Sequence, residues 1–396
     1  MKKLLLIMTT SPLNKYYYKK DILNTKNNKK WTVKFWNLLG IHNKKVENLF
    51  REKGSRILFH KNFININENK VLKKALNKLP KSFFYINYAA RSYKLSMIDR
   101  LLEYHGGKKV FLNEKPIPAR DRNFRDNLNY VLENLGIRII FRFFQYIYTF
   151  INDRIKFKIR AKPKIYFVSN DFLFRQASKK KNILLVKKIQ NYEYETFFNS
   201  SKLKRRKQHI LWVDQELNFS FDQKMNYHSN PLMSNKIYWS KIEKFLLFIK
   251  EKSGINPIVA ANHRRNIYDK PIKNKFFFDK TVELIKDSKI VISHNSLALQ
   301  MAVLFRKPII LLTIPSMASF GKYSRNDLVC KQFSEETGAK TVNLDDFSYS
   351  KNKHNFSYFL KVNNSKYNKF IKKWLNFRNP REVGNWKVIL NELDKI

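Results

Sequence analysis

The sequence predicts an α/β protein built from two doubly wound, mostly parallel sheets. Short apolar runs of strand type alternate with helical stretches along most of the chain, which is typical of repeated βα units. The 396 residues are enough for two domains of ordinary size. Hydrophobic residues make up 43% of the chain, which is enough to fill real cores and excludes a disordered protein.

The first half of the chain carries repeated strand and helix patterns. Apolar runs typical of strands are expected at residues 4–8, 56–60, 83–88, 110–113, 164–168 and 182–186. Helical patterns are expected at residues 31–39, 44–53, 68–79 and 95–104. We therefore place the first domain at residues 1–200, and it includes an aromatic and basic helical segment at 120–160.

The second half, residues 205–396, shows the same alternation and forms the second predicted domain. Strands are expected at residues 209–214, 258–261, 290–292, 309–312 and 341–344. Helices are expected at residues 234–253, 297–305 and 327–337, and Gly254 should end the first of these. The tail from Asn363 also reads as helical, and we expect it to pack back on the first domain.

The net charge of +48 is extreme. A basic surface can bind polyanions, either nucleic acid or an anionic membrane face. Lysines occur nearly everywhere in the chain, so a compositional bias explains much of the excess. In either case, the charge predicts attachment to anionic surfaces.

Cysteine content and apolar run lengths narrow the class further. The single cysteine, Cys330, excludes an internal disulfide framework and a cysteine-based zinc site. The apolar run at Leu4–Met8 is shorter than the roughly seven residues of a signal-peptide core. No window reaches the roughly 18–20 apolar residues of a transmembrane helix. We therefore expect a cytoplasmic protein.

Residues 137–151 are dense in Ile, Phe and Tyr, and Arg138 and Arg142 interrupt the run. Basic residues then alternate with other types from Arg154 to Lys164. This pattern fits a helix that lies in a membrane interface, with aromatics inward and arginines on headgroups. It also fits a core-facing helix beside the domain junction, which is the usual place of an aromatic helix, and both interpretations stay open.

Four hydrogen-bonding residues, Ser293, His294, Asn295 and Ser296, form an abrupt turn between an apolar strand and a helix. Ligands of open α/β sheets bind at the carboxyl ends of the strands. Polar groups that open a helix at such a place suit a phosphate. The alternative is that Ser293 and Asn295 only cap the helix.

Two further strand ends carry candidate binding residues. Asp214 ends strand 209–214, and His263, Arg264 and Arg265 follow strand 258–261. Basic side chains at a strand end can donate to phosphate oxygens or neutralise a leaving group. The alternative is an exposed basic loop. With the turn at 293–296, these residues would form a two-loop cradle for a diphosphate or a nucleotide monophosphate.

Glu114 is the best candidate for a general base that activates an acceptor hydroxyl, because it stands at the end of strand 110–113. A plain surface glutamate is the alternative. The chain has no Walker A loop, no Gly-x-Gly-x-x-Gly, no His-Glu-x-x-His and no Gly-x-Ser-x-Gly motif. We expect neither a bound metal nor a cofactor, so basic side chains and helix N-termini would stabilise a departing phosphate.

Three stretches, 209–219, 258–265 and 291–308, resemble bacterial surface-polysaccharide glycosyltransferases of GT-B fold, which act in lipopolysaccharide, O-antigen or capsule synthesis. The resemblance implies two Rossmann-like domains that face each other across a cleft. It also implies a nucleotide-sugar donor on the C-terminal domain and a glycan or lipid-linked glycan acceptor on the N-terminal domain. The likeness is clearest over residues 205–345.

The His263 loop and the turn at 293–296 are similar to the His-Pro and Ser-Ser/Thr motifs of sialyltransferase-like enzymes and their Kdo-transferring relatives. This likeness implies a CMP-activated acidic sugar and no metal. It also implies that His263 contacts the nucleotide phosphate, that the turn holds the phosphate or the cytidine, and that Glu114 is the base. Arg264 stands in place of the family's proline, and Asn295 in place of a serine.

The leading interpretation is a glycosyltransferase, peripheral to the inner face of the cell membrane, that adds a sugar to a growing surface polysaccharide or lipopolysaccharide. A nucleic-acid-binding protein is one alternative, suggested by the charge. Because the basic residues are dispersed and no nucleic-acid motif occurs, nucleic acid is not the expected partner. A catalytically inactive glycan-binding homologue is the other alternative, and the motif departures permit it.

Overall fold

The computed structural model describes residues 2–14, 18–23, 25, 28–52, 58, 60–89, 93–114, 151, 161–200, 208–217, 233–262, 265, 268–317, 322–348, 355–375 and 384–396. The statements below concern these residues. The aromatic and basic segment at 120–160 lies outside the described residues apart from Ile151, so both interpretations of this segment remain predictions.

The first sheet has seven strands, all parallel, in the order β3-β2-β1-β4-β5-β6-β7. The strands are β1 Lys3–Thr9, β2 Trp31–Asn37, β3 Phe63–Asn65, β4 Phe83–Asn87, β5 Gly107–Asn113, β6 Ile165–Val168 and β7 Leu185–Lys188. The strand order reverses between β1 and β4, as in a doubly wound sheet.

The second sheet has six strands, also parallel, in the order β10-β9-β8-β11-β12-β13. The strands are β8 His209–Val213, β9 Pro257–Ala260, β10 Lys275–Phe277, β11 Ser288–Ser293, β12 Ile309–Thr313 and β13 Lys340–Asn343. Here the order reverses between β8 and β11, which pair directly with Val213 opposite Ser293.

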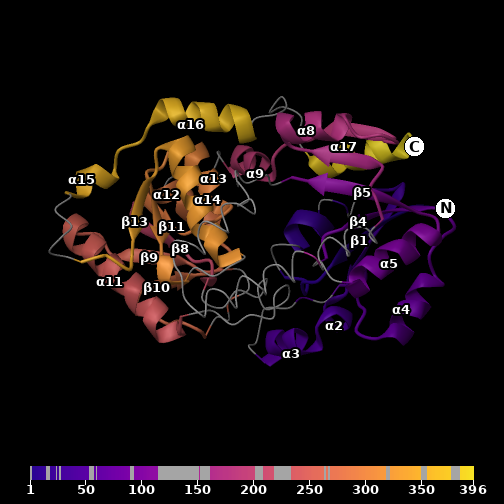
Figure 1. Cartoon of the computed structure of the whole chain (residues 1–396), viewed down its shortest axis with the longest axis horizontal. Helices are drawn as coiled ribbons and strands as arrows, with labels where there is room; N and C mark the ends of the chain where they lie inside the picture. The colour runs from indigo at the N-terminus through magenta and orange to yellow at the C-terminus, as the bar shows by residue number, and fades with distance from the viewer. Residues whose placement is uncertain are drawn as a thin grey trace.

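Helices cover both faces of each sheet, and the two sheets form two lobes (Figure 1). Around the first sheet lie η1 Tyr18–Leu23, α2 Leu39–His42, α3 Lys44–Glu52, α4 Asn69–Leu76, α5 Tyr93–Tyr104 and α8 Asp171–Ser178. Around the second lie α11 Asn235–Ser253, α12 Thr281–Asp287, α13 Ala298–Leu304, η3 Pro315–Met317, α14 Lys322–Thr337, α15 Phe356–Phe359, α16 Asn364–Phe370 and η4 Ile371–Leu375.

Two helices link the lobes. Helix α9 (Tyr192–Ser200) follows β7 of the first sheet, yet its Tyr194 and Phe197 pack against the core beneath α13 of the second. Helix α17 (Asn385–Asp394) comes from the end of the chain and buries Trp386 and Leu390 in the core of the first sheet. Both chain ends therefore lie on the same lobe (Figure 1).

Helix α11 illustrates how local sequence sets the elements. Ser234 accepts a hydrogen bond from the backbone of Ile237 and caps the start of the helix. Gly254 ends it with a φ of 68°, a left-handed conformation that glycine adopts without steric cost. Between the caps, Ile242, Phe245 and Ile249 face the sheet and are fully buried.

The predicted helix at residues 31–39 is wrong, because Trp31–Asn37 is strand β2. Alternate residues of this stretch bury aromatic and β-branched side chains against helix α17 and β1, and such residues favour strands. The strand predicted at 56–60 lies mostly outside the described residues; the edge strand of this region is β3. Among the helices that the structure describes, none is long and apolar enough to cross a bilayer.

Candidate functional site

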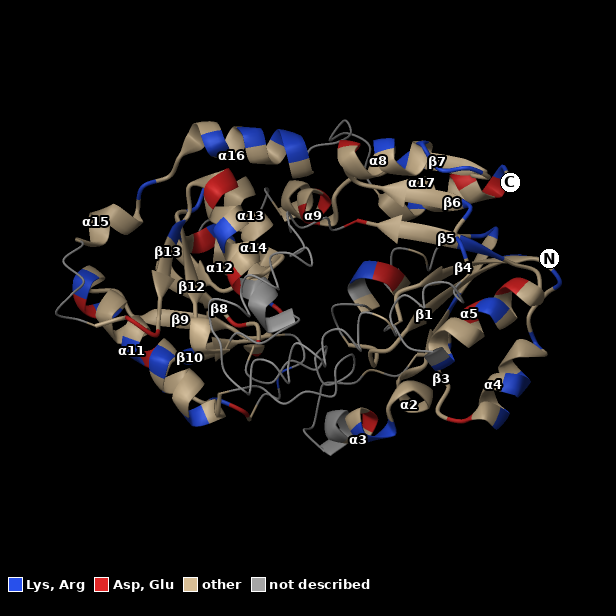
Figure 2. Cartoon of the chain, in the orientation of Figure 1, with Lys and Arg blue, Asp and Glu red and all other residues tan. Residues whose placement is uncertain are grey.

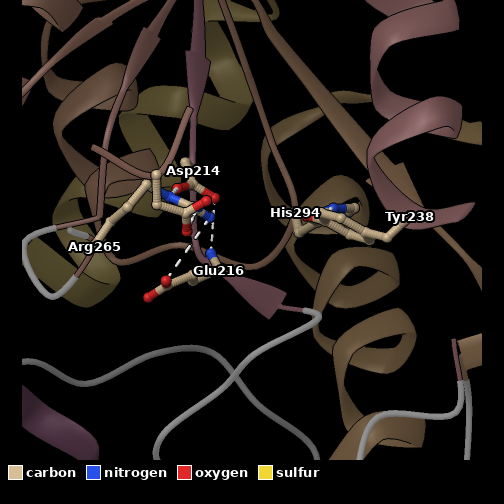
Figure 3. Close-up of polar contacts among 6 residues, drawn as sticks. Asp214, Glu216, Tyr238, Arg265 and His294 are labelled. Atoms are coloured by element: carbon tan, nitrogen blue, oxygen red, sulfur yellow. Dashed lines mark hydrogen bonds and ion pairs between the residues drawn. The ribbon is translucent and has the colours of Figure 1, made fainter. Parts of the chain in front are cut away.

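The candidate site lies where the strand order of the second sheet reverses. Asp214 directly follows β8, and the turn at 293–296 follows its neighbour β11. Arg265 follows β9, the strand on the other side of β8. Ligands of doubly wound sheets bind outside the carboxyl ends of the strands at this kind of switch point. Figure 3 shows the side chains that gather there.

Arg265 is the centre of a buried cluster of charges, and its side chain is only 2% exposed. Its Nε donates to Asp214 Oδ2 at 2.7 Å, and its Nη1 donates to Asp269 Oδ2 at 2.6 Å. Glu216 Oε1 lies 3.9 Å from Nη2. The guanidinium also lies 5.0 Å from the centre of the Trp239 ring, a cation–π contact.

Three carboxylates thus surround one guanidinium. Burial by itself would lower the pKa of Arg265, but Asp214 and Glu216 outweigh it and hold the pKa above its ordinary value. Arg265 is therefore charged at every working pH. Within the described part of the chain, the buried Nη2 has no hydrogen-bond acceptor, and Glu216 Oε1 at 3.9 Å is its ion-pair partner.

The loop after β8 is held in an unusual conformation. Glu216 has a φ of 53°, in the left-handed region that residues with a Cβ rarely adopt. Asp214 Oδ1 accepts a hydrogen bond from the Glu216 backbone N–H at 2.8 Å and stabilises this turn. Gln215 donates to the backbone carbonyl of Asn295, so the loop is fastened to the turn after β11. Strain of this kind is often stored at functional sites.

The polar turn at 293–296 divides into two buried and two half-buried residues. Ser293 donates to the Val213 carbonyl at 3.0 Å and is fully buried. His294 is also fully buried, with its Nδ1 2.6 Å from the Leu312 carbonyl and its Nε2 3.0 Å from the Tyr238 hydroxyl. These two side chains hold the sheet and α11 together, so only Asn295 and Ser296 face outward from this turn.

His294 is an uncharged histidine at neutral pH. Burial lowers its pKa to about 4, although the Leu312 carbonyl and Asp214 act in the opposite direction. Because a carbonyl only accepts, the Nδ1 carries the proton and Nε2 accepts from Tyr238. The Trp212 ring packs edge-on at 5.1 Å and completes this enclosure.

At the start of α13, the Ser296 Oγ accepts from the Ala298 backbone N–H at 3.2 Å, whereas Ser293, which the capping interpretation names, donates to the Val213 carbonyl instead. A small hollow lies beside Ser296, with room for about one water molecule, and Asn295, Gln300, Cys330 and Phe333 contribute to its lining. This hollow is too small for a nucleotide sugar, so it marks only one wall of the candidate site.

Glu114 lies at the end of β5 in the first domain, only 4% exposed. Its Oε2 is 2.5 Å from the Lys20 ammonium, which is itself buried between the rings of Tyr88 and Tyr192. Asp21 lies 3.8 Å from the same ammonium, and burial together with Glu114 raises the pKa of Asp21 to about 6 against the opposing effect of Lys20. Burial lowers the pKa of Lys20, but the two carboxylates outweigh it and raise that pKa well above its usual value.

The structure thus brings Asp214, Arg265 and the turn at 293–296 together, and it places Glu114 in the other domain. His263 and Arg264 lie outside the described residues, so their roles remain predictions. The described part of the chain contains no group of three or more His, Cys, Asp or Glu side chains able to hold a metal ion.

Sequence reasoning missed Glu216, Asp269, Trp239 and Lys20. The Asp-x-Glu spacing directly after strand β8 was a visible signal for Glu216. Trp239 and Lys20 had no such signal, because each lies on a helix from another part of the chain. Helix α11 brings Trp239 to Arg265, and η1 brings Lys20 to Glu114.

No protein-family model and no curated protein sequence matches the chain. Among solved structures, the wall teichoic acid polymerase TagF aligns with a TM-score of 0.50 at 11% identity, over 99% of this chain and 88% of that one. UDP-GlcNAc 2-epimerase of Methanocaldococcus jannaschii aligns at 0.48 and 13%, and MurG of Acinetobacter baumannii at 0.46 and 8%, each over the full length of both chains. The likeness to TagF, with the two parallel sheets, confirms the predicted GT-B fold class.

Proposed function

We propose that the protein is a glycosyltransferase that uses a nucleotide-sugar donor. One observation carries this proposal: Asp214, Arg265 and the turn at 293–296 meet at the strand-order reversal of the second sheet. This is where a doubly wound domain presents a ligand site. A fold shared with TagF, a wall teichoic acid polymerase, is consistent with transfer onto a surface polymer.

Within this proposal, Arg265 positions the loop that carries His263 and Arg264. Its guanidinium is held by Asp214 and Asp269, so most of its charge is already neutralised. The charge of the leaving phosphate therefore falls mainly to His263 and Arg264. Asn295 and Ser296 bind the phosphate from the neighbouring turn.

Glu114 is the proposed acceptor-side base. The Lys20 ammonium lies 2.5 Å from its Oε2 and places an opposite charge beside this buried carboxylate. Asp21 belongs to the same group and forms a reserve acceptor for a proton, since its pKa of about 6 lies near neutrality.

The finer parts of the proposal concern the substrates and the location. The resemblance of the His263 loop and the 293–296 turn supports a CMP-activated acidic sugar and a reaction without a metal. The acceptor would be a lipopolysaccharide or another surface polysaccharide, as in the bacterial enzymes that the sequence resembles. Such an acceptor is lipid-linked, so the enzyme would work in contact with the inner face of the cell membrane.

Thermal unfolding with CMP, UDP and GDP tests the donor proposal. One nucleotide should raise the melting temperature, because a ligand that binds only the native state stabilises it. Asn295→Ala should reduce this rise, whereas the control Asn364→Ala, an exposed asparagine on α16, should not. No response to any nucleotide, together with tight RNA binding, would instead favour the nucleic-acid alternative. A normal nucleotide response but no sugar transfer to any glycan would favour the inactive homologue.

A further inference from the structure

We propose that one basic edge of the molecule docks on the surface of an anionic lipid bilayer. The basic edge consists of α8, β7 and the turn between them in the first domain, and of α16 with η4 in the second. The biological role of this docking surface rests on the proposed function, because a glycosyltransferase with a lipid-linked acceptor must contact the membrane. The physical evidence for it, however, comes only from the surface of the described residues.

Helix α8 presents a mixed apolar and basic face to solvent. Leu173, Phe174 and Ala177 pack against β6, so the opposite side of the helix carries Phe172 and Lys179. Phe172 is 66% exposed, although burial of such a ring is strongly favourable. An exposed aromatic ring on the same helix face as a lysine is typical of surfaces that enter a membrane interface.

The turn after α8 continues this surface. Lys179, Lys180 and Lys181 are all exposed, and Leu184, just before the edge strand β7, is 58% exposed. Residues 161–188 contain eight lysines or arginines and a single acidic residue, Asp171. Asp171 pairs with Lys188 and Glu392 pairs with Lys187, and the stretch as a whole still carries an excess of positive charge.

The second part of the basic edge has the same character. Residues 361–375 contain five lysines and no acidic residue. Tyr367, Phe370 and Leu375 face the core, so Lys369 and Lys372 extend from the opposite side and are exposed. Lys373 pairs with Glu336 of α14 at 3.0 Å, and this contact fixes the segment to its domain.

Both parts lie along the same long edge of the molecule. In Figure 2, α8, β7 and α16 follow the upper outline of the two lobes, and lysine and arginine positions mark all three. A single flat surface can therefore contact both domains at once. Each exposed lysine near an anionic bilayer adds attraction, and the contributions sum over one face.

The apolar residues select a bilayer over a nucleic acid as the partner. A phosphate backbone attracts the lysines, but it has no place for an exposed leucine. A bilayer interface accepts both, because headgroups meet the lysines while Phe172 and Leu184 enter the acyl boundary.

Vesicle co-sedimentation of the full chain tests the proposal, without donor or acceptor. The probe is phosphatidylcholine vesicles with about one third phosphatidylglycerol, compared with pure phosphatidylcholine. The test variant combines Lys179→Glu, Lys181→Glu, Lys369→Glu and Lys372→Glu. Its matched control carries the same four charge reversals at exposed positions in and beside α4, away from this edge: Lys70, Lys73, Lys74 and Lys78.

We expect the wild type to bind the anionic vesicles, the basic-edge variant to bind on the order of a hundredfold more weakly, and the α4 control to stay within about threefold of the wild type. Equal losses in both variants would overturn the proposal, because the attraction would then be diffuse. Binding of the wild type to neither vesicle, or equally to both, would also overturn it.

The variant Phe172→Ser with Leu184→Ser separates a bilayer from other polyanions. It should weaken vesicle binding several-fold and leave binding to a homopolymeric RNA unchanged. Vesicle binding that is unaffected by these two changes would overturn docking on a bilayer and favour a nucleic acid. The nucleotide-dependent rise in melting temperature should be the same in all these variants. A failure of the donor proposal can therefore be distinguished from a failure of the membrane-docking proposal.

Discussion

The Arg265 side chain is buried, and three carboxylates surround its guanidinium. A buried ion pair of this kind adds little net stability, but removal of one partner leaves the others uncompensated. The cluster therefore rests on Arg265 more than on any single carboxylate. Its value lies in fixing the geometry of a site, since a pair of apolar side chains would pack equally well there.

We expect Arg265→Met to lower the free energy of unfolding by roughly 3–5 kcal/mol, because Asp214 would stay buried without its partner. Arg175→Met, on the exposed side of α8, is the matched control and should change stability by less than about 0.5 kcal/mol. Urea denaturation measures both. Equal, small effects of the two changes would show that the Arg265 cluster is not closed in solution.

His294 should make stability depend on pH. Its folded-state pKa of about 4 lies below the ordinary value of 6.5, so the stability that it contributes is present above pH 6.5 and is lost as the pH falls toward 4. His294→Gln keeps a donor and an acceptor but does not titrate. Relative to this variant, the wild type should lose on the order of 3 kcal/mol between pH 7 and pH 4. Parallel pH profiles of the two proteins in denaturant unfolding would contradict the buried, neutral imidazole.

At the scale of elements, α17 joins the last residues of the chain to the first sheet. The Asn385 side-chain amide makes two hydrogen bonds with the backbone of Gln190, just after β7. Its Oδ1 accepts from the Gln190 N–H at 2.9 Å, and its Nδ2 donates to the Gln190 carbonyl at 2.7 Å. Gln190 also donates to the Leu375 carbonyl at the end of η4. Leu375, where the chain leaves the second domain, is therefore hydrogen-bonded to Gln190, where the chain enters that domain. This link restricts how the two domains can move.

Trp386 anchors this helix, with only 3% of its surface exposed. Trp386→Ala should lower the free energy of unfolding by roughly 3–5 kcal/mol, through lost burial and the cavity left behind. The neighbouring Lys387→Ala is exposed and should have an effect near zero. Guanidinium denaturation measures both, and near-identical midpoints would mean that α17 does not pack on the first sheet in solution.

At the scale of the whole molecule, 79 basic residues face only 31 acidic ones. An excess of one sign destabilises the compact state through self-repulsion. Dissolved salt screens this repulsion, since the Debye length falls from roughly 30 Å at 0.01 M to roughly 10 Å at 0.1 M. At low salt, the same charge also lets the basic edge attract an anionic surface over a longer distance.

We therefore expect the melting temperature to rise as sodium chloride is increased from about 0.01 M to about 0.1 M. Sucrose at matched osmolality serves as the control for effects that do not involve charge, and it should not reproduce the steep initial rise. A melting temperature that falls with salt would mean that attractive ion pairs, not the excess of positive charge, dominate the energetics of the fold.

The alternation of apolar runs and helical patterns was enough to predict two parallel-sheet domains. A parallel sheet is buried on both faces, so each of its strands appears in the sequence as a short, continuous apolar run. The limits of α11 and the role of Gly254 could be read in the same way. The strand at Trp31–Asn37 could also have been read locally, because its buried and half-buried residues alternate at first and its aromatic and β-branched side chains favour a strand. Strand ends with polar residues also pointed to Asp214, Arg265 and the 293–296 turn.

The sequence by itself determined the fold class and the strand ends where a ligand site can form, because both depend on local order along the chain. Only the tertiary structure decided what each polar residue does there. Ser293 and His294 turn inward, since the Val213 and Leu312 carbonyls and Tyr238 complete their hydrogen bonds. Arg265 acquires its partner Asp214, and Glu114 its partner Lys20, through contacts between distant segments of the chain that a local sequence pattern does not show.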